Sequence, residues 1–177
     1  MTMRVIGLAG WSGAGKTTLL ARVIPELTAQ GLKVSTVKHA HHAFDVDTPG
    51  KDSWRHRQAG ASEVLVASAK RFALMHELRD EEEPRLADLL KRLSPVDLVI
   101  VEGFKAERHA KIEVHRAANG KPFLHPDDPA IAGLVTDGDC ASGLPRAHLD
   151  DIPAVAAMML TLALPLADAL ERLEGEG

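Results

Sequence analysis

Short apolar runs alternate along the chain with longer segments in which apolar residues recur every three or four positions. The runs predict strands and the longer segments predict helices. Predicted strands cover residues 4–9, 33–38, 64–67, 72–78, 97–101, 111–116 and 131–135. Predicted helices cover residues 16–30, 54–59, 152–160 and 166–173, and Pro84 opens a further one. This alternation favours an α/β fold, a mostly parallel sheet with helices on both faces.

Individual residues set several of the predicted boundaries. We expect Pro25 to kink the first helix and Gly31 to end it. Asp52-Ser53 is predicted to cap the second helix. The strands over residues 64–67 and 72–78 are separated by Ser68-Ala69-Lys70-Arg71, which is typical of a hairpin turn. We therefore expect these two strands to pair antiparallel at one edge of the sheet.

Length and composition limit the classes of protein to consider. The 177 residues fit a single nucleotide-binding domain over 1–177, and a net charge of −4 without basic blocks argues against nucleic-acid binding. The single cysteine, Cys140, excludes an internal disulfide. Because no segment is typical of a signal peptide or a membrane span, we expect a soluble, cytoplasmic protein.

The most informative stretch is Gly-Trp-Ser-Gly-Ala-Gly-Lys-Thr, at residues 10–17. It matches the pattern of Gly, four residues, then Gly-Lys-Ser/Thr, and it stands between a predicted strand and a predicted helix, as the phosphate-binding P-loop requires. Glycines let successive amide N–H groups turn inward onto phosphate oxygens, and the helix that follows adds the positive end of its dipole. The residues predicted to bind the nucleotide here are Gly10, Ser12, Gly13, Ala14, Gly15, Lys16, Thr17 and Thr18.

Side chains of the loop and of a neighbouring strand end predict a magnesium-nucleotide site. Lys16 is expected to neutralise the β and γ phosphates and to be catalytic, and Thr17 to coordinate Mg²⁺. Glu102 follows the nearly continuous apolar run 98–101, where proteins with this loop keep the acidic residue that holds Mg²⁺. Gly103 directly after it permits a close backbone approach to phosphate.

The polar stretch that follows residue 38 contains His39, His41 and His42 and allows three interpretations. It is a transition-metal site, a nucleotide-sensing loop or an exposed polar loop. In the nucleotide-sensing interpretation, Asp45 and Asp47 are the candidate catalytic residues that orient the attacking water, and Asp52 is a candidate Mg²⁺ ligand.

The sequence contains fewer signals for recognition of the nucleotide base than for binding of phosphate and Mg²⁺. Asp137 follows a predicted strand and is a candidate guanine reader, although a strand-end aspartate that caps a turn has the same pattern. No arginine is evidently placed to neutralise charge in the transition state. Arg55 and Arg57 are candidates only if their helix packs at the site.

These motifs resemble the molybdopterin-guanine dinucleotide biosynthesis adapter protein family, MobB. The resemblance covers most of residues 5–116 and rests on the stretches 11–20, 38–42, 45–47, 49–52, 57–61, 66–68 and 98–105. It implies a GTP-binding protein with weak hydrolysis that acts as a homodimer beside the guanylyltransferase (MobA-like) that joins GMP to molybdopterin. The family's nucleotide-binding residues carry over to Gly13–Thr18, its acidic strand end to Glu102, and its Lys-His-x-His-His loop to residues 38–42.

Two other functions compete with a GTPase adapter that uses GTP and Mg²⁺. A metal-delivery GTPase would use the three histidines as ligands. A small-molecule kinase would need a base for a substrate hydroxyl, and no acid is evidently placed for that role.

Overall fold

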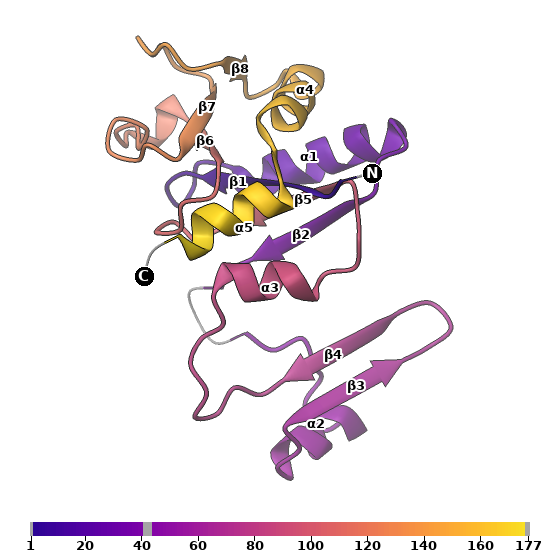
Figure 1. Cartoon of the computed structure of the whole chain (residues 1–177). Helices are drawn as coiled ribbons and strands as arrows, with labels where there is room; N and C mark the ends of the chain where they lie inside the picture. The colour runs from indigo at the N-terminus through magenta and orange to yellow at the C-terminus, as the bar shows by residue number, and fades with distance from the viewer. Residues whose placement is uncertain (1, 41–43, 176–177) are drawn as a thin grey trace. The chain divides into compact units, whose positions relative to one another are not determined.

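The computed structural model describes residues 2–40 and 44–175, whose helices and strands are labelled in Figure 1. The strands are β1 (Arg4–Ala9), β2 (Val34–Lys38), β3 (Glu63–Ala67), β4 (Phe72–His76), β5 (Leu98–Glu102), β6 (Lys111–His115), β7 (Ile131–Thr136), β8 (Arg146–His148) and β9 (Leu164–Pro165). The α-helices are α1 (Lys16–Ala29), α2 (Asp52–Gln58), α3 (Leu86–Arg92), α4 (Ile152–Leu162) and α5 (Leu166–Glu174), and η1 (Ala117–Asn119) is a short 3₁₀ helix.

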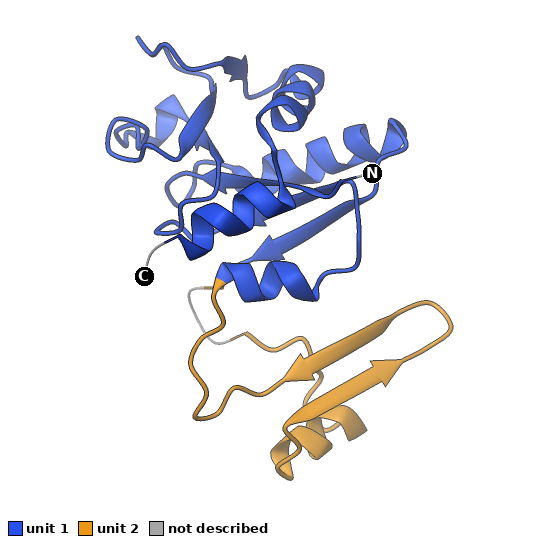
Figure 2. Cartoon of the chain, in the orientation of Figure 1, with its two compact units in different colours: residues 1–39, 86–177 blue, residues 40–85 orange. Residues whose placement is uncertain are grey.

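The chain divides into two compact units, coloured separately in Figure 2. The larger unit comprises residues 1–39 and 86–177, and the smaller one comprises residues 40–85. The larger unit contains the main sheet and the P-loop, whereas the smaller unit contains α2 and the β3–β4 hairpin. The expectation that all 177 residues form one nucleotide-binding domain stays a prediction.

The main sheet is mostly parallel, as predicted. In the described residues it has seven strands, in the order β2-β5-β1-β6-β7-β8, and the short β9 pairs antiparallel with β1. The register places Leu8 of β1 beside Glu102 of β5, and Ala9 beside Glu113 of β6. The carboxyl ends of β5, β1 and β6 therefore meet at one edge of the sheet. The sequence pattern missed β8 and β9, because runs of three and two residues carry too little periodicity.

Helices cover both faces of this sheet, which confirms the predicted α/β architecture. On one face, α1 and α4 pack over Ile6 and Leu8 of β1, and on the other face α3 and α5 pack over Val5. Every residue of β5 except the last is buried, as expected of a central strand. No helix in the described part of the chain is long and apolar enough to cross a membrane.

The predicted hairpin forms, but not at the predicted place. β3 and β4 pair antiparallel, with Leu65 opposite Leu74, and they make a two-stranded sheet of their own. The expectation that they extend an edge of the main sheet is therefore wrong. Local alternation and a turn determine that two neighbouring strands pair, but they carry no information on which sheet the pair joins.

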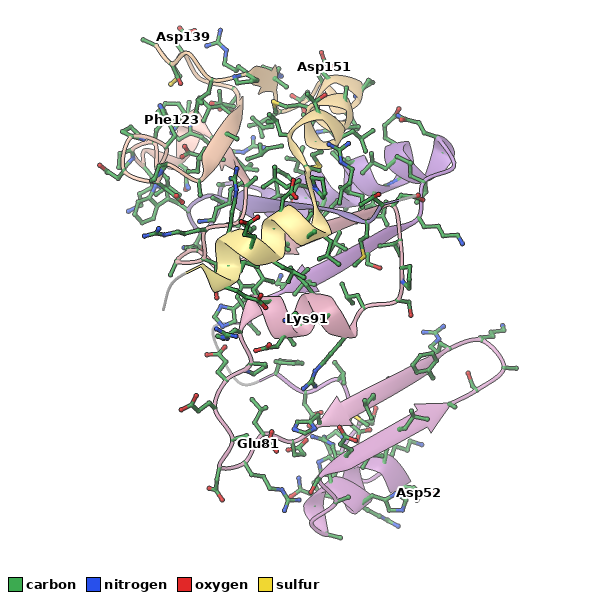
Figure 3. The ribbon with its side chains drawn as sticks, in the orientation of Figure 1. Asp52, Glu81, Lys91, Phe123, Asp139 and Asp151 are labelled. Carbon is green, nitrogen blue, oxygen red and sulfur yellow. The ribbon has the colours of Figure 1, made fainter. Side chains whose placement is uncertain are left out.

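Local capping rules describe the ends of some helices in this chain but not of others. Gly31, with a φ of +83°, follows α1 as predicted, and Asp151 (labelled in Figure 3) caps α4 by accepting a hydrogen bond from the Ala154 amide. The predicted cap of α2 is wrong, because Lys51 occupies the cap position and Asp52 already belongs to the helix. The Ser53 hydroxyl instead donates a hydrogen bond to Asp47 at 2.8 Å.

Strand β6 is buried along its whole length, on both faces. Three buried polar side chains on it hold the loops that precede and follow it. The ammonium of Lys111 donates to the Lys105 carbonyl and to Asp128, and Glu113 accepts hydrogen bonds from the amides of residues 124 and 125. The imidazole of His115 bonds the carbonyl of residue 121. A buried polar group is tolerated when it is paired in this way.

The crossover between β5 and β6 buries a histidine against β1. His109 is 1% exposed, and neither of its ring nitrogens has a hydrogen-bond partner among the described residues. Its ring occupies the space that a Cβ on Gly7 would fill, so Gly7 permits the crossover to pass over the sheet. Burial, reinforced by the nearby Lys111 ammonium, lowers the pKa of His109 to about 4.

This lowered pKa predicts a pH dependence of stability. The unfolded chain protonates His109 near pH 6.5 and the folded chain only near pH 4, so the stability is complete above pH 6.5 and falls as the pH drops toward 4. The loss amounts to roughly 3 kcal/mol. Urea unfolding of wild type and of His109→Leu between pH 7 and pH 4 measures it. The leucine variant should lose less stability over this range, and identical pH profiles would contradict the assignment.

Candidate nucleotide site at the carboxyl ends of the parallel strands

The residues between β1 and α1 adopt backbone angles that only glycine takes easily. Gly10, Gly13 and Gly15 have φ values of +146°, +81° and +91°. A Cβ on Gly10 would collide with the carbonyl oxygen of Val114, so the loop passes directly against β6. Ala14 is buried in the core beneath the loop, whereas Ser12, Thr17 and Thr18 are exposed. The predicted loop therefore forms between the predicted strand and helix.

Lys16 lies across this loop. Its ammonium donates hydrogen bonds to the carbonyl oxygens of Gly10 at 2.9 Å and Trp11 at 3.1 Å. Burial lowers the pKa of Lys16, Lys105 and Lys38 act in the same direction, and Glu102 opposes them. The ammonium is thus a partly desolvated cation among other cations, a setting that favours an anionic ligand.

The two residues predicted to share a magnesium ion are in contact, although 85 positions separate them in the chain. The Thr17 hydroxyl donates a hydrogen bond to Glu102 Oε1 at 3.1 Å, and Lys38 Nζ lies 3.6 Å from the other carboxylate oxygen. Glu102 ends β5 between β1 and β2, and 14% of its side chain is exposed. A hydroxyl and a carboxylate are hard oxygen donors of the kind that Mg²⁺ prefers, so these residues fit that ion.

Gly103 directly follows β5, and the backbone at His39 passes close to it. It has a φ of +94°, and a Cβ on it would lie 2.7 Å from the Cβ of His39. The His39 ring stacks on Phe104, with 4.8 Å between the ring centroids. The predicted close approach of Gly103 to phosphate stays a prediction. Among the described residues, the neighbour that lies against Gly103 is His39.

The remaining histidines of that stretch, His41 and His42, lie outside the described residues. Among residues 2–40 and 44–175, no group of three or more His, Cys, Asp or Glu side chains is arranged to hold a metal ion. The described side chains therefore provide no support for the metal-delivery interpretation.

In the smaller unit, the aspartates predicted to be catalytic are bound to an arginine. The guanidinium of Arg57 donates to Asp45 at 2.8 Å, to Asp47 at 3.3 Å and to Glu77 at 2.7 Å. The hydrogen bond from the Asp47 amide, followed by that from Arg57, lowers the pKa of the Asp45 carboxyl. Asp52 is an exposed residue in the first turn of α2. The catalytic and metal-binding roles of these aspartates stay predictions.

The segment after β6 also borders the P-loop, which the sequence did not indicate. The Asn119 amide donates to the Ser12 carbonyl at 3.0 Å, and the Trp11 indole donates to the Pro122 carbonyl at 2.8 Å. The guanidinium of Arg116 lies over Gly15, 3.5 Å from the position that a Cβ there would take. These contacts join residues about a hundred positions apart, so no local pattern could reveal them. The one available signal was that residue 116 ends a predicted strand.

Asp137, the candidate guanine reader, stands beside this segment at the end of β7. Its Oδ1 accepts a hydrogen bond from the Ala117 amide at 2.7 Å, and its Oδ2 lies 3.8 Å from Arg116 Nη1. Its carboxylate therefore caps the start of η1. The role of Asp137 in reading the base stays a prediction.

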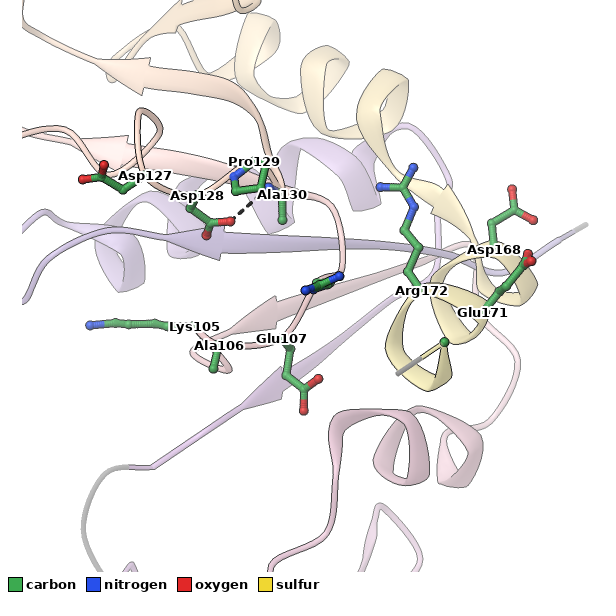
Figure 4. A pocket seen from close by; sticks show the side chains of 12 residues that line it. Lys105, Ala106, Glu107, Asp127, Asp128, Pro129, Ala130, Asp168, Glu171 and Arg172 are labelled. Atoms are coloured by element: carbon green, nitrogen blue, oxygen red, sulfur yellow. Dashed lines mark hydrogen bonds between the residues drawn. The ribbon is translucent and has the colours of Figure 1, made fainter. Parts of the chain in front are cut away.

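A separate cavity of about 1150 Å³ lies between α5 and the loops that precede β6 and β7 (Figure 4). Its charged lining combines Lys105 and Arg172 with acids from both sides, among them Asp127, Asp168 and Glu171. Charges of both signs specify no single class of ligand. The P-loop residues do not line this cavity, so it is distinct from the nucleotide site.

The parallel sheet and its strand–loop–helix unit define the P-loop class of α/β proteins. Residues 5–137 match the model of the family described as molybdopterin guanine dinucleotide synthesis protein B. The chain therefore belongs to the MobB family.

Individual relatives agree with this assignment. The chain is 51% identical to the molybdopterin-guanine dinucleotide biosynthesis adapter protein of Escherichia coli (strain K12) over 118 residues, which are 66% of this chain and 67% of that protein. Its identity to the adapter protein of Haemophilus influenzae is 44%, over 72% of each chain. A crystal structure of molybdopterin-guanine biosynthesis protein B superposes with a TM-score of 0.68 at 32% identity, over 89% of this chain and 97% of that one.

The crossing at Gly103 yields a prediction about stability. Gly103→Ala should destabilise the fold by about 1–3 kcal/mol, because alanine disfavours this φ and its Cβ would press on His39. Urea unfolding measures the loss. Gly143→Ala is the matched control, because a Cβ at Gly143 meets open space. Equal unfolding midpoints for the two variants would contradict this account of the crossing.

Proposed function

We propose that this protein is a GTP-binding adapter with weak GTPase activity that assists a guanylyltransferase in attaching GMP to molybdopterin. The observation that carries the proposal is the joint position of Lys16, Thr17 and Glu102. A partly desolvated ammonium lies across a glycine loop, and two hard oxygen donors are in contact beside it. The names of the relatives, adapter proteins of molybdopterin-guanine dinucleotide biosynthesis, support the pathway.

In this proposal the chain's own groups bind and orient the nucleotide. Inward-turned amides of residues 13–17 and the N-terminus of α1 bind phosphate oxygens, and Lys16 exchanges its carbonyl partners for the β and γ phosphates. Thr17 and Glu102 would hold Mg²⁺, which neutralises phosphate charge when bound.

Slow hydrolysis is consistent with the smaller unit. Asp45 and Asp47 each accept hydrogen bonds from Arg57, so either carboxylate has to give up that ion pair before it orients a water molecule. Arg57 also pairs with Glu77, so it would have to give up these carboxylates before it could act as a transition-state cation.

A competition titration of GTP against ATP, with and without Mg²⁺, tests this function. Lys16→Ala should weaken GTP binding by about 10- to 100-fold, because it removes a charge-assisted contact. Glu102→Gln should abolish most of the gain in affinity that Mg²⁺ produces. Lys33→Ala, which removes an exposed lysine from the same unit, is the control and should bind like wild type. Unchanged GTP affinity in Lys16→Ala would refute the proposed site.

The β3–β4 hairpin supports the proposed homodimer. Leu65, Phe72 and Leu74 lie on one face of this two-stranded sheet, with exposed fractions of 61%, 73% and 52%. Two strands alone are marginally stable, and clustered exposed apolar side chains mark an interaction surface. Among the described residues, each strand also has an edge that pairs with no further strand, and we propose that a second copy of the chain packs on this face.

Sedimentation velocity tests the dimer. Wild type should sediment as a dimer and Leu74→Glu as a monomer, because the new carboxylate would be desolvated in the apolar interface. Lys70→Glu places the same charge in the turn of the hairpin and should stay dimeric. A monomeric wild type, or a dimeric Leu74→Glu variant, would contradict the proposed surface.

A further inference from the structure

The residues after β6 make a second wall of the P-loop. Besides the Asn119 hydrogen bond to Ser12, the Asn119 Oδ1 atom lies 3.2 Å from the position of a Cβ on Gly13. Lys121 lies over the Trp11 ring, 5.9 Å from its centroid. Several contacts therefore hold this segment against the loop. Arg116 lies between β6 and Asn119, so these contacts limit where its side chain can lie.

Arg116 brings a cation to the point where the loop becomes a helix. Its Nη2 and Nε atoms lie 3.5 and 3.8 Å from the Cβ position of Gly15, the cap residue of α1. The N-terminus of a helix carries a partial positive charge, so a guanidinium there is unfavourable unless an anion accompanies it. Lys16 is the next residue after Gly15, so the start of α1 carries a second cationic side chain.

The anion that accompanies Arg116 in this structure satisfies it only in part. Asp137 Oδ2 lies 3.8 Å from Arg116 Nη1, and the other Asp137 oxygen is bound to the Ala117 amide. The Arg116 side chain remains 45% exposed. A planar guanidinium offers several donors in a fork that matches phosphate oxygens, and one long contact leaves most of them for a ligand.

We propose that Arg116 is a phosphate-binding residue of the nucleotide site, which donates hydrogen bonds to the phosphate at the Gly15 end of the loop. Asp137 acts through Arg116 as a positioning residue, because its fixed carboxylate directs the guanidinium toward the loop. This inference rests on the proposed function. It assigns to the end of β6 a phosphate contact that the Gly-Lys-Thr motif does not contain.

Titration of Arg116→Ala with two probes, GTP and inorganic tripolyphosphate, both with Mg²⁺, tests the proposal. A phosphate contact predicts a loss of about tenfold in affinity for both probes. Arg116→Lys should recover only part of it, because an ammonium lacks the fork. Arg22→Ala is the matched control: Arg22 is also 45% exposed and also pairs with an aspartate, and it lies further along α1. It should change either affinity less than twofold.

A double-mutant cycle tests the positioning role. Asp137→Asn keeps an acceptor for the Ala117 amide but removes the charge that directs Arg116. It should weaken tripolyphosphate binding in wild type and have no further effect in Arg116→Ala. A merely structural role would weaken binding equally in both backgrounds.

Other results would overturn the inference. A loss confined to GTP would place Arg116 on the base or ribose. An equal loss in Arg22→Ala would mean that Arg116 acts only through long-range charge. No loss in Arg116→Ala would mean that Arg116 forms only a surface ion pair. If Lys16→Ala also binds GTP normally, the proposed function itself fails. If Lys16→Ala loses binding while Arg116→Ala keeps it, only the role of Arg116 fails.

Discussion

The parallel pairing of β1 with β5 on one side and β6 on the other is the constraint on which the site depends. Its register places Leu8 beside Glu102 and Ala9 beside Glu113, so three strands deliver their following residues to the same edge. The hydroxyl of Thr17 then reaches Glu102 across 85 positions of sequence. Thr17 makes this contact from within α1, and Glu102 makes it from within β5. The rigid sheet thereby preorganises the two oxygen donors.

Close backbone approach at this edge requires positions without side chains. Gly7 makes room for the His109 ring, Gly10 for the Val114 carbonyl and Gly103 for His39. At each of these positions a Cβ would collide with a neighbour from a distant segment. The glycines of this chain therefore serve two purposes: those of the P-loop adopt positive φ values that disfavour other residues, and Gly7 and Gly103 let other segments cross the strands closely.

The two faces of the sheet are stabilised by different interactions. Apolar side chains of α1 and α4 cover one face. The other face is covered partly by α3 and α5 and partly by loops that are hydrogen-bonded to β6. Lys111, Glu113 and His115 supply these attachments from a single strand, each paired with backbone or carboxylate groups. Because these bonds position the segment after residue 120, they also support the contacts that Asn119 and Pro122 make with the P-loop.

The sequence by itself determined the order of most helices and strands, the P-loop and the acidic strand end at Glu102. These features depend on periodicity, on turn residues and on motifs within a few positions, and local backbone physics decides them. Tertiary structure alone decided that β3 and β4 form their own sheet, that Ser53 bonds Asp47 instead of capping α2, and that Arg116 lies over Gly15. Such contacts join residues whose spacing carries no periodic signal, because packing brings them together only after each element has formed.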